Sequence, residues 1–222
     1  MSDVNSTYSA RTSYADRGVV DSYEEHRFSG ALGRYRWRRE QNAVSAMLAG
    51  LPGGLSVLDV PCGIGRWWPL LATKAASIEA LDVSPAMLQT ARTRVDRVPV
   101  DVAVREGNAE SLEYPDDEFD LVFSHALTKH LPIPIQYAVM GEFARVSREW
   151  VVCSFGVFDP VNYQVWKRLG LAESYPLLPE QFRDLCGAVG LRVVDSAKCT
   201  TPVGVERSFL LRKASDVPPG DR

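Results

Sequence analysis

The fold of this chain is decided by residues 57–66, which read Val57-Leu58-Asp59-Val60-Pro61-Cys62-Gly63-Ile64-Gly65-Arg66. An aliphatic run of the strand type ends in a turn that contains two glycines, and a helical pattern follows. Glycine lets the backbone approach a ligand closely, and the N–H groups at the start of a helix bind anionic groups. A second strand pattern ends at Asp82, 19 positions after Gly63, where an acidic side chain commonly binds ribose hydroxyls. The segment therefore predicts a site for a nucleotide-type ligand.

The glycine turn fits neither of two common nucleotide sites. A dinucleotide fingerprint has a third glycine three residues after the second, and Trp68 takes that place here. A phosphate-binding P-loop ends in Gly-Lys-Ser or Gly-Lys-Thr, and no such triplet follows the turn. A third kind of ligand is therefore indicated.

Two later segments support that third option. Gly107-Asn108-Ala109-Glu110 follows an expected strand at residues 100–105, and another expected strand ends in Ser124 and His125. With the glycine turn and Asp82, these segments resemble the class I S-adenosylmethionine-dependent methyltransferases, in order and at ordinary spacings from about residue 55 to 212. The block Arg145-Val146-Ser147-Arg148, in place of the usual Pro-Gly-Gly turn, is similar to one bacterial subgroup of that superfamily.

Strand and helix patterns alternate along the chain, which predicts an α/β fold with a mainly parallel sheet and helices on both faces. The resemblance implies a Rossmann-like sheet of seven strands. The short connection at 200–205 predicts a hairpin, and hence an antiparallel last strand at the edge of the sheet. Strands are expected at 55–60, 77–82, 100–105, 118–124, 150–155, 191–199 and 206–212, and helices at 35–50, 66–76, 84–96, 133–147 and 179–189.

We expect three parts in the chain: an N-terminal helical cap or lid (1–50), a methyltransferase core (51–212) and a disordered tail (213–222). Residues 156–178 interrupt the alternation and are rich in aromatic residues and proline. They follow the fifth strand, at the end of the sheet where open α/β folds bind ligands. This insertion is either part of an acceptor pocket, through Phe158, Tyr163 and Trp166, or a surface segment with its own apolar cluster.

The resemblance implies residues for each part of the S-adenosylmethionine cofactor. The turn from Gly63 to Gly65 would bind the methionine carboxylate, and Asp82 would bind the ribose hydroxyls. Asp59 would support the turn and the amino group of the cofactor, or else cap the turn without touching ligand.

The adenine is assigned to Asn108 and Ala109, where the family usually has Asp-Ala. Met87 covers the adenine or belongs to the core. By the same resemblance, Ser124 at the end of the expected fourth strand would lie beside the cofactor.

Methyl transfer needs a base only when the acceptor keeps its proton at neutral pH. His125 borders the sulfonium end of the cofactor by analogy, and histidine is the natural base near pH 7. His130 is the second candidate, with His26, a carboxylate or no base as alternatives. Tyr23 and Arg27 are spaced to share one helical face, where they cover the cofactor, grip an anionic acceptor or simply face solvent.

The composition gives no reason to expect a polyanionic partner, because the 222 residues carry a formal net charge of −3. Four arginines between residues 34 and 39 do not form one stripe on a helical wheel, so nucleic acid is not favoured as a substrate. The four cysteines are dispersed without a C-x-x-C pair, which predicts no metal site and a reduced, cytoplasmic setting. No apolar run reaches the roughly 18 residues of a membrane helix, and the N-terminus lacks a signal-peptide pattern.

The resemblance implies transfer of a methyl group to an acceptor. The modest length and the aromatic insertion favour a small molecule, with a hydroxyl oxygen as first choice and nitrogen as the next, in a setting such as bacterial secondary metabolism. Two alternatives stay open: methylation of RNA or protein, and binding of the cofactor without methyl transfer. Monomer and homodimer are equally compatible with the sequence.

Overall fold

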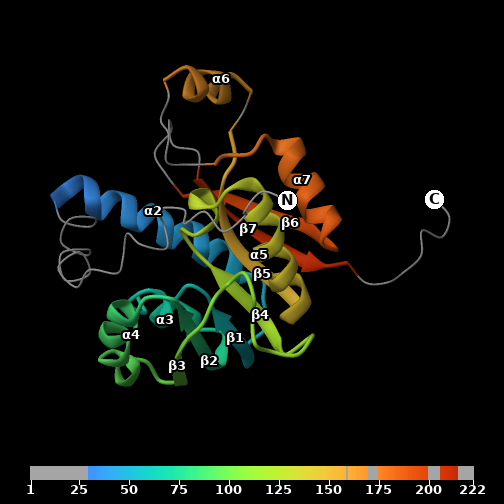
Figure 1. The fold of residues 1–222 in the computed structure, drawn as a ribbon. Coiled ribbons are helices and arrows are strands. Elements are labelled where there is room, and N and C mark those ends of the chain that lie inside the picture. Colours follow the sequence, from blue (N-terminus) through green and yellow to red (C-terminus); the bar gives the residue numbers. More distant parts are fainter. Residues whose placement is uncertain (1–29, 159, 170–174, 200–205, 215–222) are drawn as a thin grey trace.

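The computed structural model contains one sheet of seven strands, in the order β3-β2-β1-β4-β5-β7-β6 (Figure 1). It describes residues 30–158, 160–169, 175–199 and 206–214. Tyr23, His26 and Arg27 therefore lie outside the described residues. The strands are β1 (Leu55–Asp59), β2 (Ala75–Asp82), β3 (Asp101–Glu106), β4 (Phe119–Ser124), β5 (Ser147–Gly156), β6 (Leu191–Lys198) and β7 (Glu206–Lys213).

The neighbouring pairs from β3 to β5 are parallel, and β7 is antiparallel to both β5 and β6. The predicted α/β sheet with an antiparallel last strand is thus confirmed, but the predicted edge position is wrong. The strand β7 lies inside the sheet, and β6 forms the edge. Burial explains the order, because Phe209, Leu210 and Leu211 of β7 are buried whereas residues 192–195 of β6 are exposed.

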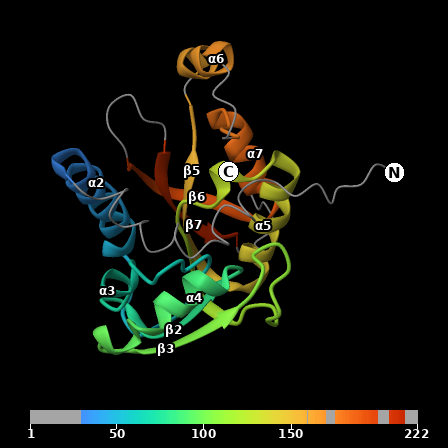
Figure 2. The same cartoon turned by 60° about the vertical axis from the view of Figure 1, so that its left-hand side comes forward.

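Helices cover both faces of the sheet (Figure 2). Successive residues of β4 point to opposite faces: Leu121 and Phe123 pack with α2, α3 and α4, and Val122 packs with α5 and α7. The helices are α2 (Gly30–Ala49), α3 (Trp68–Leu71), α4 (Pro85–Arg92), α5 (Ile133–Val146), α6 (Pro160–Leu169) and α7 (Pro179–Ala188), with 3-10 turns η2 (Val95–Arg97) and η3 (Thr128–His130).

The helix predicted at 66–76 is much shorter than expected. The helix α3 spans four residues, and β2 already begins at Ala75. Ala75 pairs with Leu55 of β1, so strand pairing overrides the helix propensity of the alanines there. The helix predicted at 84–96 is likewise divided into α4 and η2.

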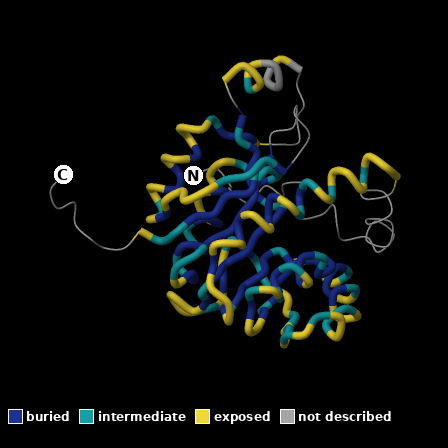
Figure 3. Tube along the Cα trace, turned by 180° about the vertical axis from the view of Figure 1, so that it is seen from behind, coloured by how far each residue is buried: buried dark blue, intermediate teal, exposed yellow. Residues whose placement is uncertain are grey.

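Residues 156–178 leave the sheet and return to it. Val157 forms a bridge with Leu177, and Phe158 donates its N–H to the Leu177 carbonyl at 3.0 Å. Between these contacts, α6 stands away from the sheet (Figure 1). Figure 3 shows buried stretches along the strands, and exposed ones on α6 and the outer half of α2. The strand β7 runs through Lys213, the first residue of the expected tail, and residues 215–222 lie outside the described residues.

Candidate functional site

The glycine turn lies between the ends of two strands. Cys62 donates its N–H to the Leu81 carbonyl of β2 at 2.7 Å, and Val60 donates to the Phe123 carbonyl of β4 at 2.9 Å. Gly63 and Gly65 have φ angles of 53° and 75°, in the left-handed region that glycine adopts without strain. Sequence and fold therefore place this turn at the carboxyl edge of the sheet, where open α/β sheets bind ligands.

The N–H groups of the two glycines are used within the protein. Gly63 donates to Asp82 Oδ2 at 2.9 Å, and Gly65 donates to the Cys62 carbonyl at 2.9 Å. Because α3 has only four residues, the predicted long helix does not begin at this turn. The N–H groups of Gly63 and Gly65 therefore already have acceptors within the protein, and binding of the methionine carboxylate at this turn stays a prediction.

Trp68 explains why the turn has no third glycine. Its side chain is fully buried, and an ideal Cβ on Gly65 would lie 2.7 Å from three of its ring carbons. The indole Nε1 donates to Asp59 Oδ2 at 3.0 Å. This hydrogen bond could not be predicted from sequence, because the two residues are nine positions apart and a turn of unknown shape lies between them.

Asp59 is completely buried at the end of β1. Its second oxygen, Oδ1, has no hydrogen-bond partner in the part of the chain that the structure describes. Burial raises the pKa of the Asp59 carboxyl well above its ordinary value, and the Trp68 hydrogen bond opposes that shift. The site therefore holds a buried acceptor atom that a cationic group can satisfy.

Asp82 is held more symmetrically. Its Oδ2 accepts from Gly63, and its Oδ1 accepts from the Ser84 N–H at 2.9 Å. Ser84 in turn caps α4 by accepting the Met87 N–H at 3.3 Å. Burial raises the pKa of the Asp82 carboxyl despite these backbone donors.

One pocket brings together Asp82, Asn108 and Ala109, three of the residues expected at the cofactor. The pocket does not include Met87, which is buried against Ile64 and Ala86. Asn108 Oδ1 accepts the Glu110 N–H at 3.1 Å, so one acceptor position of this amide is used locally. The pocket is completed by Val60, Pro61, Val83, Gly107, Glu110, Leu127, Leu131 and Val139.

His125 follows β4 and is buried beside two aromatic rings. Its ring centroid lies 4.6 Å from that of Trp67 and 6.4 Å from that of Phe123. Trp67 also contacts Trp37 of α2 at 4.8 Å, and these aromatic contacts were not predicted from the sequence. Ser124 is buried next to His125, and its hydroxyl has no hydrogen-bond partner among the residues described.

His130 ends η3 and is half-buried. The backbone near it is fixed by a polar cluster that sequence analysis missed: Ser154 Oγ accepts the Ala126 N–H at 2.7 Å and donates to Glu206 Oε1 at 3.1 Å. Lys129 pairs with the other oxygen of Glu206 at 2.8 Å. These residues lie far apart in sequence, and only the pairing of β5 with β7 brings Ser154 and Glu206 together.

Only some of the residues predicted to contact the methyl acceptor are described in the structure. Phe158 is buried and Tyr163 is half-buried, and neither lines the pocket at Asp82. Trp166 belongs to α6, but its side chain is outside the described part of the structure, as are Tyr23 and Arg27.

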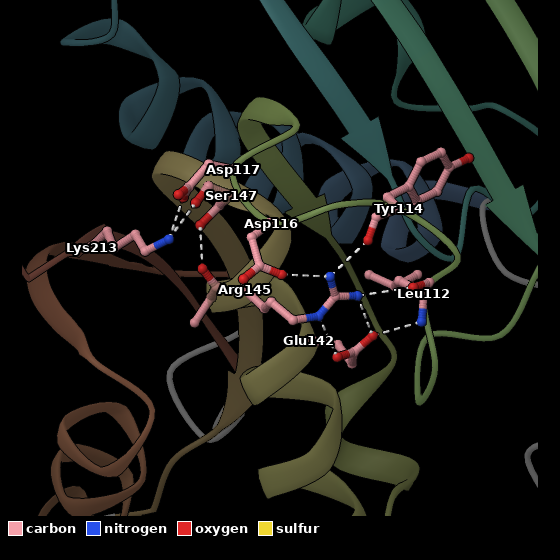
Figure 4. Close-up of polar contacts among 9 residues, drawn as sticks. Leu112, Tyr114, Asp116, Asp117, Glu142, Arg145, Ser147 and Lys213 are labelled. Carbon is pink, nitrogen blue, oxygen red and sulfur yellow. Dashed lines mark hydrogen bonds and ion pairs between the residues drawn. The ribbon is translucent and has the colours of Figure 1, made fainter.

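The loop after Asn108 is fastened by Arg145 at the end of α5 (Figure 4). Nε and Nη2 each donate to one oxygen of Glu142 at 2.8 Å. The same guanidinium donates to the carbonyls of Leu112 at 2.9 Å and Tyr114 at 2.7 Å, and to Asp116 Oδ1 at 3.0 Å. Arg145 therefore connects the Arg145-Val146-Ser147-Arg148 block to the loop that carries Asn108 and Ala109.

Within the described ranges, no group of three or more histidine, cysteine or acidic side chains is arranged to hold a metal ion. In the same ranges, no helix combines the length and the apolar character that crossing a membrane requires.

Comparison with known proteins agrees with this geometry. Residues 57–149 match a family model described as a methyltransferase domain. Methyltransferase GfsG from Streptomyces halstedii is 40% identical over 102 residues, which cover 43% of this chain and 34% of that protein. The malonyl-[acyl-carrier protein] O-methyltransferase of a Paenibacillus species is 33% identical, over 48% of this chain and 40% of its own. The demethylmenaquinone methyltransferase of Bacillus licheniformis is 30% identical, over 63% and 56%. The matched segments thus span about a third to a little over half of these relatives.

Solved structures share the fold over most of the chain. The magnesium protoporphyrin IX methyltransferase of Synechocystis PCC 6803, solved with bound S-adenosylhomocysteine (SAH), has a TM-score of 0.75 and 18% identity, and covers 92% of this chain and 98% of its own. A structure described as the [4+2]-cyclase SpnF has a TM-score of 0.61 and 18% identity, over 82% and 80%. The Rossmann-like methyltransferase fold is therefore established for this chain.

Proposed function

We propose that this chain, whose residues 57–149 belong to the methyltransferase domain family, transfers a methyl group from S-adenosylmethionine to a small-molecule acceptor. A hydroxyl oxygen is the first choice of acceptor atom and nitrogen the second. The observation that carries the proposal is the pocket that joins Asp82, Asn108 and Ala109 beside the glycine turn. When bound, S-adenosylmethionine supplies a methyl group that its sulfonium centre activates.

The residues of the site fit the parts of this cofactor. Both oxygens of Asp82 accept backbone N–H groups, and a carboxylate has about four acceptor positions in all, which suits two ribose hydroxyls. Asp59 Oδ1 suits the ammonium group of the methionine part, because a buried carboxylate oxygen without a donor is costly until a cation or donor reaches it. The turn from Gly63 to Gly65 is assigned to the methionine carboxylate, and the N–H groups of the two glycines themselves are directed to Asp82 and to the Cys62 carbonyl.

The binding site of the methyl acceptor is assigned to the region at the carboxyl ends of β4 and β5. His125 takes the acceptor proton in this proposal, and His130 is the second candidate. Residues 1–50, with Tyr23 and Arg27, are assigned to covering the site. The segment 156–178 contributes Phe158, Tyr163 and Trp166 to the acceptor pocket. The four arginines between residues 34 and 39 do not form one stripe on a helical wheel, and the formal net charge is −3, so nucleic acid is not proposed as a partner.

A second candidate function is binding of the cofactor without methyl transfer. It is favoured by one comparison, since a protein of the same fold is described as a [4+2]-cyclase and not as a methyltransferase. The fold and the cofactor pocket are common to both candidates, so only turnover separates them.

The cofactor assignment is tested by titration calorimetry with SAH. We expect Asp82→Ala to weaken binding by roughly 1.5–3 kcal/mol, the range for a hydrogen bond to a charged group. Asp101→Ala, at the exposed start of β3, serves as the matched control and should bind as the wild type does. Unchanged affinity in folded Asp82→Ala protein removes Asp82 from the ribose site, and tighter binding of NAD than of SAH overturns the cofactor.

Turnover is tested by mass spectrometry with S-adenosylmethionine and a panel of phenols, hydroxy acids and amines. His125→Ala should lower kcat about 10²–10⁴-fold while SAH affinity stays unchanged. If His125→Ala keeps more than about a third of the wild-type kcat, His125 is not the general base. Binding of SAH without methylation of any acceptor class would favour the second candidate.

A further inference from the structure

Trp68 is fixed on two sides at the glycine turn. Its six-membered ring lies against Gly65, so closely that a Cβ there would stand 2.7 Å from the ring. Its indole N–H points to Asp59 Oδ2 at 3.0 Å, and the side chain is fully buried. A buried tryptophan with its N–H directed at one acceptor has little freedom to reorient.

The contact leaves Asp59 with an asymmetric environment. One oxygen accepts from Trp68, and the other has no hydrogen-bond partner in the described ranges. The groups that face this carboxyl are Asp82 at the end of β2, Arg66 in the turn, and the Cys62 thiol. A donor that holds Oδ2 therefore also fixes the direction in which Oδ1 points.

We propose that Trp68 is a positioning residue that orients the Asp59 carboxylate so that its Oδ1 binds the ammonium group of the cofactor's methionine part. The inference rests on the proposed function, since it requires S-adenosylmethionine as the ligand. It goes further because it assigns a role to Trp68, which stands in the place of a third glycine. Trp68, together with the turn, gives the site its preference for a ligand that carries an ammonium group.

The test compares two ligands that share adenosine: SAH, which carries the amino-acid part, and 5′-methylthioadenosine, which lacks it. Trp68→Phe keeps a ring against Gly65 and removes the N–H donor. We expect this variant to lose about tenfold in affinity for SAH, the lower end of the effect of one hydrogen bond to a charged group, and to bind 5′-methylthioadenosine as the wild type does. Trp150→Phe, in β5 beside Arg212, controls for the loss of a partly buried indole.

A pH series separates positioning from packing. The Trp68 hydrogen bond lowers the pKa of Asp59 against the effect of burial, so removing it raises that pKa. Because the ionised carboxylate is the form that binds an ammonium group, the loss of SAH affinity on acidification should begin at a higher pH in Trp68→Phe. Asp59→Asn should abolish this dependence, and Trp68→Phe should then add little to it.

Equal losses for both ligands, or unchanged SAH affinity with an unshifted pH profile, would overturn the positioning role while leaving the proposed function intact. Wild-type protein that fails to bind SAH overturns the proposed function and this inference with it. If Trp68→Phe does not fold, the NMR resonance of the Trp68 indole N–H in the wild-type protein tests the positioning role instead. It should shift on binding SAH and stay in place with 5′-methylthioadenosine, and the reverse would contradict the proposal.

Discussion

Asp59 and Asp82 end neighbouring strands, and the backbone around each decides how its charge is compensated. Asp82 receives two backbone N–H groups, one at each oxygen, whereas Asp59 receives a single indole N–H. Both carboxyls are buried, and burial raises the pKa of each. Asp59 has the larger uncompensated cost, which a ligand with a cationic group would relieve.

This difference predicts a pH-dependent stability. An unfolded Asp59 ionises near pH 3.9, while the folded carboxyl with its raised pKa keeps its proton to a higher pH. Between the unfolded and the folded pKa of Asp59, the folded state binds more protons than the unfolded state. Asp59 therefore lowers the stability of the protein as the pH rises through this range. We expect the Tm of Asp59→Asn, relative to wild type, to rise from pH 4 toward pH 8 in ligand-free protein.

Asp101→Asn at the exposed start of β3 is the control and should show no such trend. A Tm difference between Asp59→Asn and wild type that stays constant over this range would contradict the raised pKa of Asp59.

At the scale of elements, the Arg145 side chain joins α5 to the loop at 107–118 through several contacts. Arg145 makes a bidentate pair with Glu142 and reaches two loop carbonyls (Figure 4). Lysine cannot reproduce this planar fork. Arg148, three residues later, pairs with Asp120 at a more exposed position, where an ion pair contributes little.

We therefore expect Arg145→Lys to lower the free energy of unfolding by about 2 kcal/mol in urea denaturation, and Arg148→Lys by less than about 1 kcal/mol. Because the same loop carries Asn108 and Ala109, Arg145→Lys should also weaken SAH binding. Equal losses in the two variants would show that the fork geometry of Arg145 is unimportant.

At the scale of the whole molecule, the strand order decides which backbone is protected. The strand β7 has a hydrogen-bonded partner on each side, and β6 has one. We expect amides of residues 208–211 to exchange with deuterium more slowly than those of residues 192–195, measured by mass spectrometry on native protein. Faster exchange in β7 than in β6 would contradict the observed order.

The local order of elements was readable from the sequence because it depends on nearby residues. Aliphatic runs, Ser84-Pro85 before α4, and the glycines of the turn each encode their own backbone, and the predicted strands lie within a few residues of the observed ones. The approach of Asp82 to Asn108 and Ala109 also followed, since parallel strands bring their carboxyl ends to one edge.

Tertiary structure alone decided the remainder. The hairpin fixed β6 beside β7, but burial of Phe209, Leu210 and Leu211 placed β7 inside the sheet. Pairing of Ala75 with Leu55 shortened the helix after the turn. The Trp68–Asp59 hydrogen bond and the Ser154–Glu206 contact join residues whose meeting depends on how the turn folds and which strands pair. Sequence patterns report a residue's own backbone and burial, whereas such contacts depend on where the rest of the chain packs.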